Sequence, residues 1–496
     1  MMRMRRIGSW LWRWTRRLAY ALVAVVLVII AVRVVDSQMG PPLELWHTEI
    51  PDEPRAAQIN QMDWAAYLAA ERRVFAQVER EVTARIPPEA RTPENRFFAE
   101  SPIHPPRFAQ DWNRSFVLEP TLEQFGGRAR GAVVLIHGLT DAPYSLRHVA
   151  ELYRAEGFVA LGLRVPGHGT VPAGLTEAVW EDWTAATRMA MREARRRAGP
   201  DGVVHMVGYS NGGALSLKHA MDAVEDASLV RPDRVIVVSP MVGVSPFARF
   251  AGLAGLPAML PRFAKAAWLS VLPEFNPFKY NSFPVNAAVQ SFRLTQEVQG
   301  QVRRLSRAGR LDGLAPILAF QSLMDFTVST RALVDDFFAL LPANGSELVI
   351  FDRNRGTKLS FLLRPAFDPA VERIVPDPPR NWRLAIITNR DENSLEMVAR
   401  VTPAGATEEE VIPLPGLLYP RDVYSLSHVA LPFPESDSLY GLRPEPEGEF
   451  GVSLGATAIR GETGVLVMAL DSLVRISWNP FFAHMAGRIR EALPPR

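Results

Sequence analysis

A serine lies in a short glycine-rich motif near the middle of the chain. Gly208-Tyr209-Ser210-Asn211-Gly212 fits the pattern G-x-S-x-G, in which the serine is a nucleophile on a sharp turn. The apolar run 203–207 before it predicts a buried strand, and 213–218 after it predicts a helix. A serine on such a turn projects its hydroxyl away from the sheet. We therefore expect Ser210 to be a catalytic nucleophile rather than part of an ordinary glycine-rich turn.

A serine hydroxyl is a weak nucleophile near neutral pH, so it needs a base within hydrogen-bond reach and an acid that orients the base. In folds with this motif the chain order is serine, acid, histidine. Of the nine histidines, only His428 and His484 follow the strand predicted at 316–321. His428 lies in a short loop before Pro432, whereas His484 lies in a predicted C-terminal helix, so we expect His428 to be the base.

The expected acid is Asp325, four residues past the strand predicted at 316–321. Asp335 and Asp336 fall on the following helix, where solvated charges are the ordinary interpretation, and Asp141 is a third, weaker candidate.

A tetrahedral oxyanion needs preorganised donors. We expect these donors to be the backbone N–H groups of Asn211, directly after the nucleophile, and of Leu139, in the loop after the strand 132–136. His137 in that loop and His168 in a Pro-Gly-His-Gly turn are interpreted as residues that brace their turns. No metal or cofactor is needed for this chemistry.

The elements that must position these residues alternate between strands and helices. Strands are predicted at 132–136, 158–163, 203–207, 234–238, 316–321 and 347–351, and helices at 144–156 and 180–197. Apolar, β-branched strands that alternate with helices predict a mostly parallel sheet covered on both faces.

Four motifs together resemble one family. Residues 134–140 (VLIHGLT), 166–169 (PGHG), 208–212 (GYSNG) and 238–241 (VSPM) are similar to the bacterial carboxylesterase and monoacylglycerol lipase branch of the α/β-hydrolases, which overlaps with the S33 serine aminopeptidase-like group. The resemblance covers about 115–340 and resumes near His428. It implies an α/β-hydrolase fold with Ser210, Asp325 and His428 as the catalytic triad and Leu139 and Asn211 as oxyanion donors. Asp325 and His428 lie farther apart in the chain than is usual in that branch.

Two insertions are predicted within the hydrolase domain, which we place at 115–496. The segment 240–312 is rich in Phe, Leu, Met and Pro and is expected to form a helical cap over an apolar pocket, although a satellite core without a ligand role is the alternative. The segment 353–420 has β character and accounts for the long interval between Asp325 and His428. Residues 37–114 are expected to be a proline-rich tether (37–60), a juxtamembrane helix packed on the catalytic domain (64–86) and a segment that wraps the domain. A helix that lies on a surface or binds a partner is the alternative for 64–86.

The first 36 residues predict a membrane anchor. Residues 18–32 are an unbroken uncharged run, which Arg33 can extend by snorkelling. Six arginines precede the run and acids dominate after it, so the positive-inside rule places the N-terminus in the cytoplasm and the large domain outside. No convincing cleavage site follows, which favours an uncleaved signal anchor over a signal peptide.

Composition narrows the class of protein further. The net charge is +2, but residues 1–40 carry about +6, so the basic excess belongs to the predicted anchor and does not indicate nucleic-acid binding. The absence of cysteine excludes disulfides, thiolate metal sites and a lipid-modified cysteine anchor.

The sequence therefore predicts a single-pass serine hydrolase of the inner membrane, with its catalytic domain in the periplasm, that cleaves apolar acyl esters. A thioesterase, and an aminopeptidase or amidase of the same fold, remain alternatives. The cap carries Glu274 and Glu297 but no recognisable acidic cluster for a substrate amine. A catalytically idle scaffold that binds envelope partners through 353–420 is the alternative from another class.

Overall fold

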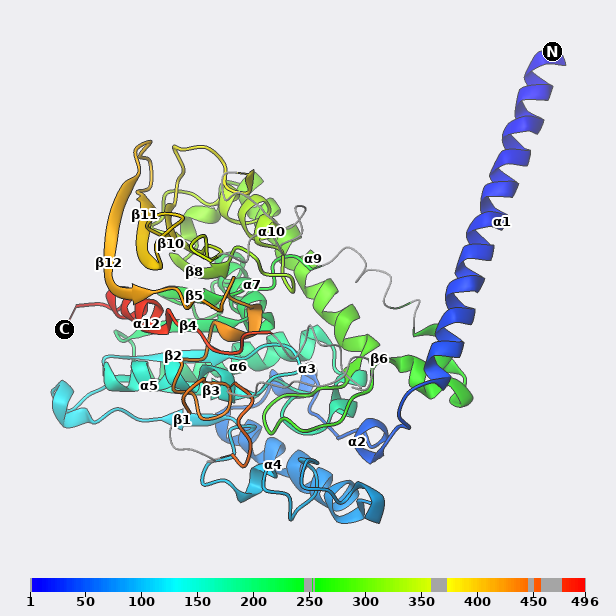
Figure 1. Ribbon diagram of the computed structural model, residues 1–496, viewed down its shortest axis with the longest axis horizontal. Coiled ribbons are helices and arrows are strands. Elements are labelled where there is room, and N and C mark those ends of the chain that lie inside the picture. The colour runs from blue at the N-terminus through cyan, green and yellow to red at the C-terminus, as the bar shows by residue number, and fades with distance from the viewer. Residues whose placement is uncertain are drawn as a thin grey trace.

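A 10-stranded sheet forms the centre of the computed structural model, which describes residues 2–244, 252, 255–357, 373–444, 450–455 and 475–495 (Figure 1). The strand order is β1-β3-β2-β4-β5-β8-β9-β10-β11-β12. The run from β3 to β10 is parallel, while β1, β11 and β12 pair antiparallel with their neighbours at the two ends of the sheet. The prediction of an α/β-hydrolase fold with a mostly parallel sheet is confirmed. The strands are β1 (Phe116–Leu118), β2 (Gly131–Ile136), β3 (Phe158–Leu163), β4 (Val203–Tyr209), β5 (Arg234–Val238), β8 (Ile317–Ser322), β9 (Glu347–Phe351), β10 (Arg383–Asn389), β11 (Glu396–Thr402) and β12 (Glu410–Leu418).

Helices cover both faces of the sheet, which is why the central strands are apolar along their whole length. One face packs against a cluster that includes Trp183, Leu215 and Leu294. The other packs against a cluster that includes Tyr153 and Met485. The helices of the first face include α6 (Trp180–Ala198), α7 (Asn211–Glu225), α9 (Val285–Arg307) and α10 (Thr330–Asp335), and those of the second are α5 (Arg147–Ala155) and α12 (Phe482–Glu491).

The β-rich segment predicted as an insertion extends the central sheet. β10 runs parallel to β9, with Leu384 opposite Leu348, and β11 and β12 continue outward from it. A sheet that ended at β9 would leave a row of unpaired backbone groups, and β10 satisfies them. Residues 358–372 of this segment lie outside the described part of the chain.

The segment predicted as a tether packs against the hydrolase domain. It forms the short helices α2 (Leu45–Thr48) and α3 (Ala56–Ile59), and Trp46 and Ile59 are buried. The longer helix α4 (Trp64–Glu81) follows, with Asp63 as its N-cap, and buries Tyr67 in the main core. The sequence does not predict this packing, because the segment is rich in proline and charged residues and its buried apolar residues are few and widely spaced.

A buried ion network joins this segment to the sheet. Arg164, at the end of β3, is fully buried and donates to both carboxylate oxygens of Glu53 and to one of Glu71, at 2.7–3.1 Å. Glu71 also accepts from the Ser115 hydroxyl at 2.7 Å, and the Tyr67 hydroxyl donates to the Arg164 carbonyl at 2.7 Å. The N-terminal segment is therefore part of the domain's interior.

Within the predicted cap, α9 belongs to the helix layer of the main domain. Its apolar side chains Leu294, Val298 and Val302 are buried in the core that α7 shares. The part of the cap before α9, residues 255–284, contains the short helical turns η8 (Leu256–Met259) and η9 (Pro261–Ala267) and the strands β6 (Trp268–Ser270) and β7 (Phe283–Pro284). Phe247 and Phe250 lie outside the described residues.

The first helix, α1 (Met2–Gln38), stands away from the rest of the molecule (Figure 1). Its stretch Trp12–Val32 is long and apolar enough to cross a membrane and is not buried against the protein. A signal sequence near an N-terminus has the same properties. Where α1 ends, the Lys265 ammonium of η9 donates to the carbonyls of Met39 and Gly40 at 2.9 and 3.2 Å.

Candidate active site

Ser210 lies on the tight turn between β4 and α7, as the glycine motif predicts. Its backbone has φ 54° and ψ −113°, a combination that residues other than glycine rarely adopt. The turn is held by its N–H, which donates to the Val238 carbonyl at 3.0 Å. A methyl group on Gly212 would lie 1.9 Å from the Ile136 carbonyl oxygen, so glycine is required there for the turn to approach β2.

The structure brings Ser210, His428 and Asp325 into one chain of hydrogen bonds. His428 Nε2 lies 3.0 Å from Ser210 Oγ, and His428 Nδ1 lies 2.8 Å from Asp325 Oδ2. With Nδ1 as the donor to Asp325, Nε2 is free to accept the Ser210 proton. Ser210 and His428 are 7% and 4% exposed, so the pair lies in a largely water-excluded setting. Of the alternatives, His484 lies on α12 and Asp335 and Asp336 at the end of α10.

The surroundings of Asp325 keep its carboxylate charged and fixed. Burial alone raises its pKa, but the neighbouring His428 and the N–H groups of Val328 and Thr327 outweigh burial, and the pKa lies below the ordinary value. Those two N–H groups donate to Oδ1 at 3.0 and 2.8 Å. The second oxygen, which faces His428, also accepts from the Gln321 amide at 3.2 Å.

Hydrogen bonds to the sheet explain how residues 103 positions apart meet. The Ser322 hydroxyl, at the end of β8, donates to the Leu426 carbonyl at 2.9 Å. The Asn354 amide, just after β9, donates to the Val423 carbonyl at 2.9 Å. The loop that carries His428 follows β12 in the sequence, and these two hydrogen bonds hold it against the ends of β8 and β9.

The loop after β2 lies against the nucleophile. A methyl group on Gly138 would lie 3.2 Å from Ser210 Cβ, which places Leu139 beside the turn. Among the described residues, the backbone N–H groups of Leu139 and Asn211 donate to no other backbone group. Thr140 has φ 63° and its carbonyl accepts from the Tyr280 N–H at 2.8 Å, so the cap segment fixes the far end of this loop.

His137 braces the loop, as predicted. Its Nε2 accepts from the Val165 N–H at 3.1 Å, so its Nδ1 carries the proton and donates to the Gly138 carbonyl at 2.8 Å. This arrangement requires a neutral ring, and burial together with the neighbouring His168 holds the pKa of His137 well below its usual value. Burial likewise lowers the pKa of His168 to about 4, and its Nδ1 bonds to the Pro166 carbonyl within its own turn.

Asp141 gives a testable pH dependence. Burial raises its pKa to about 6, although Lys279 opposes the shift. The folded protein thus binds a proton between about pH 4 and pH 6 that the unfolded chain has released, so this residue lowers stability as pH rises through that range. We compare the unfolding free energy of Asp141→Asn with that of the wild type at each pH. We expect this difference to be about 3 kcal/mol more favourable to the variant at pH 8 than at pH 4.

Denaturant unfolding of both proteins at the two pH values measures this difference. Asp335→Asn is the control, because that side chain is half exposed on α10. A stability difference between Asp141→Asn and the wild type that does not change with pH would contradict the expectation.

Two residues that support the site are not evident from the sequence. Gln321 orients Asp325 and also bonds to the Thr330 hydroxyl at 3.1 Å. Tyr209 lies with its ring 5.4 Å from that of His428. The only sequence signal for Gln321 is an uncharged polar residue in an apolar strand. No group of three or more His, Asp or Glu side chains that could hold a metal occurs among the residues described.

The sheet order and the strained serine turn between β4 and α7 define an α/β-hydrolase. Comparison with known proteins specifies the branch. The family model of the S33 serine aminopeptidases matches residues 127–355. The chain is also 26% identical over 197 residues to a thermostable monoacylglycerol lipase from Bacillus sp. (strain H-257), which covers 40% of this chain and 71% of the relative.

Solved structures with a similar chain include lipolytic enzymes. A structure reported for the metagenome-derived lipolytic enzymes LipS and LipT matches with 23% identity and a TM-score of 0.34. The match covers 44% of this chain and 79% of the other chain. The monoacylglycerol lipase of Paleococcus ferrophilus matches with 17% identity and a TM-score of 0.35, over 48% and 88%. By its sheet, the family model and the curated relative, the chain is a serine hydrolase of the α/β-hydrolase fold that resembles monoacylglycerol lipases.

Proposed function

We propose that this chain is a membrane-anchored serine esterase that cleaves apolar acyl esters. The observation that carries the proposal is the unbroken hydrogen-bond chain from Ser210 through His428 to Asp325, at 3.0 and 2.8 Å. A nucleophile, a base within reach and a buried carboxylate that orients the base are the requirements of acyl transfer.

In this mechanism Ser210 Oγ attacks the ester carbonyl while its proton passes to His428 Nε2. The oxyanion that forms accepts hydrogen bonds from the N–H groups of Leu139 and Asn211. His428 then gives its proton to the alkoxy oxygen, the alcohol leaves, and an acyl ester of Ser210 remains. Water, deprotonated by His428, releases the carboxylic acid and restores Ser210. Asp325 remains ionised and stabilises the imidazolium that forms in each step.

Features beside the end of α1 support a substrate from a lipid phase. Met259 and Leu260 are 82% and 60% exposed in the cap, and Lys265 joins the cap to the carbonyls that follow α1. We propose that α1 spans the inner membrane with the N-terminus in the cytoplasm. The six arginines before the apolar run favour this orientation, which would place the hydrolase domain in the periplasm.

The acids of the cap argue against an aminopeptidase. Such an enzyme would need free carboxylates to hold a substrate amine. The buried Glu274 carboxylate already accepts from the N–H groups of Asn281 and Ser282, at 3.0 and 2.8 Å, and Glu297 pairs with Arg304. An ester has no such requirement.

Labelling with a fluorophosphonate followed by hydrolysis of p-nitrophenyl esters of increasing chain length tests the proposal. We expect covalent labelling at Ser210 and faster turnover of octanoyl than of acetyl esters. Equal or better turnover of the acetyl ester would refute the preference for apolar chains. A folded wild type that takes no label would instead favour the idle scaffold.

A further inference from the structure

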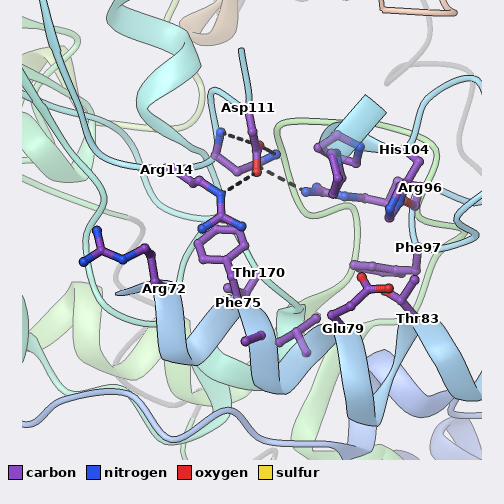
Figure 2. A pocket seen from close by; sticks show the side chains of 16 residues that line it. Arg72, Phe75, Glu79, Thr83, Arg96, Phe97, His104, Asp111, Arg114 and Thr170 are labelled. Atoms are coloured by element: carbon purple, nitrogen blue, oxygen red, sulfur yellow. Dashed lines mark hydrogen bonds and ion pairs between the residues drawn. The ribbon is translucent and has the colours of Figure 1, made fainter. Parts of the chain in front are cut away.

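A cavity of about 530 Å³ lies away from Ser210, between α4 and the segment that follows it (Figure 2). This volume falls in the range of small-molecule sites. Much of its lining is apolar, including Phe75 and Val78 of α4 and Phe97, Pro105 and Pro106 of the next segment. None of the proposed catalytic residues lines it.

A buried arginine without a carboxylate partner lines this cavity. Arg96 is 2% exposed, and its guanidinium donates only to neutral groups: the carbonyls of Asn276 and Lys279 and the side-chain oxygen of Asn113. Its Nε has no hydrogen-bond partner among the described residues. The carboxylates of Glu274 and Asp111 attract Arg96 from a distance but form no ion pair with it, and burial still lowers the pKa of the guanidinium. The desolvation cost of this buried cation is therefore offset only in part. An anionic ligand in the cavity would offset that cost.

The other charges define where the anion would lie. Figure 2 shows Arg72 and Arg114 on one side of the hollow and Glu79 with Thr83 on the other. Arg114 is engaged by Asp111 at 3.1 Å and lies over the Phe75 ring at 3.8 Å. Arg72 is exposed on α4 at the margin of the cavity. Arg96 lies across the hollow from Arg72 (Figure 2), so we place the anionic head in the space between the two guanidinium groups and the ligand's apolar part along Val78 and Phe97.

We propose that this cavity is a second ligand site, which binds an apolar chain with a carboxylate head. An apolar wall with one buried guanidinium and a second at its margin matches a single negative charge on a hydrocarbon. The choice of a carboxylate among anions rests on the proposed function, since ester hydrolysis releases this class of molecule. The site itself rests on the cavity and on Arg96.

Photo-crosslinking of the full-length protein in lipid nanodiscs tests the site. The protein is first treated with fluorophosphonate, so that the catalytic pocket is blocked, and then exposed to dodecanoate with a diazirine at its far end. Mass spectrometry of the peptides should place the crosslinks in residues 72–83 and 96–106. Crosslinks confined to other segments would overturn the proposal, whatever the enzyme's activity on esters.

Two neighbouring arginines of α4 supply a matched pair of variants. Arg72 lines the cavity, whereas Arg73, also exposed, does not. We expect Arg72→Glu to reduce capture of the probe at least fivefold and Arg73→Glu to leave it unchanged. Equal capture by the two variants would refute the role of the charge. Excess dodecanoate should displace the probe where dodecanol does not, and equal displacement by dodecyl phosphate would refute selection for a carboxylate.

Discussion

Replacing Ser210 with alanine is expected to lower kcat/KM for p-nitrophenyl octanoate by about 10⁴- to 10⁶-fold. The hydroxyl oxygen is the atom that would become acylated, and it lies 3.0 Å from His428 Nε2, the proposed base. His428→Ala should cause a loss of the same order, because the serine then keeps its proton. The double variant should be no slower than either single one, since the two groups act as a unit.

Matched variants separate this effect from damage to the fold. Ser425→Ala removes a hydroxyl from the loop that precedes His428, and His484→Ala removes the other candidate base on α12. Both are expected to retain activity within about twofold of the wild type, a change of about 0.4 kcal/mol. Labelling by fluorophosphonate that survives in His428→Ala but is lost in His484→Ala would assign the base to His484 and overturn the mechanism proposed here.

Arg164→Met is expected to produce the largest loss of stability among single substitutions in the described chain's ion pairs, about 3–5 kcal/mol. Methionine keeps an unbranched, flexible side chain but leaves the carboxylates of Glu53 and Glu71 buried without a cation. Both side chains are only 4% exposed, so water cannot replace the arginine. Thermal and denaturant unfolding of the detergent-solubilised protein measure the change.

The control for this experiment is an ion pair of similar length at the surface. Arg154 pairs with Glu151 at 2.6 Å, with nearly half of each side chain exposed. Arg154→Met should cost less than about 1 kcal/mol, because solvent screens such pairs. If Glu53→Gln and Glu71→Gln are added to Arg164→Met, much of the lost stability should return. An equal cost for Arg154→Met and Arg164→Met would show that burial does not determine the effect.

The residues near Ser210 were predictable because their signal is local. A strand, a G-x-S-x-G turn and a helix occur in one stretch of sequence, and strands β2, β3, β5 and β8 begin and end within about two residues of the predicted limits. The pairing of His428 with Asp325 was also foreseen, from the order of residues along the chain. The hydrogen bonds from Ser322 and Asn354 that hold His428 in place were not, since they join segments far apart in sequence.

Non-local packing accounts for what the sequence did not reveal. The pattern of residues 383–401 indicates strands, but periodicity carries no information on which strand lies beside them, so the continuation of the sheet by β10 was missed. Likewise, Glu53 and Arg164 have the residue types of a solvated surface. Only the structure shows that each compensates the other's charge in the interior.

The integration of residues 41–114 into the interior determines how readily the proposed anchor can be separated from the hydrolase domain. Many membrane enzymes behave as modules, in which a protease or a gene rearrangement detaches the catalytic unit intact. Here a cut between α2 and β1 would divide the chain within a segment that contributes Tyr67 to the main core. The same segment contains Arg96, which donates to the Asn276 carbonyl. Asn276 lies close in sequence to Tyr280, whose N–H donates to the Thr140 carbonyl beside the active site. A released form that keeps this whole segment covalently joined to the domain requires cleavage in the few residues between Gln38 and Leu45. Any change that mobilises the rest of the segment alters the hydrolase itself.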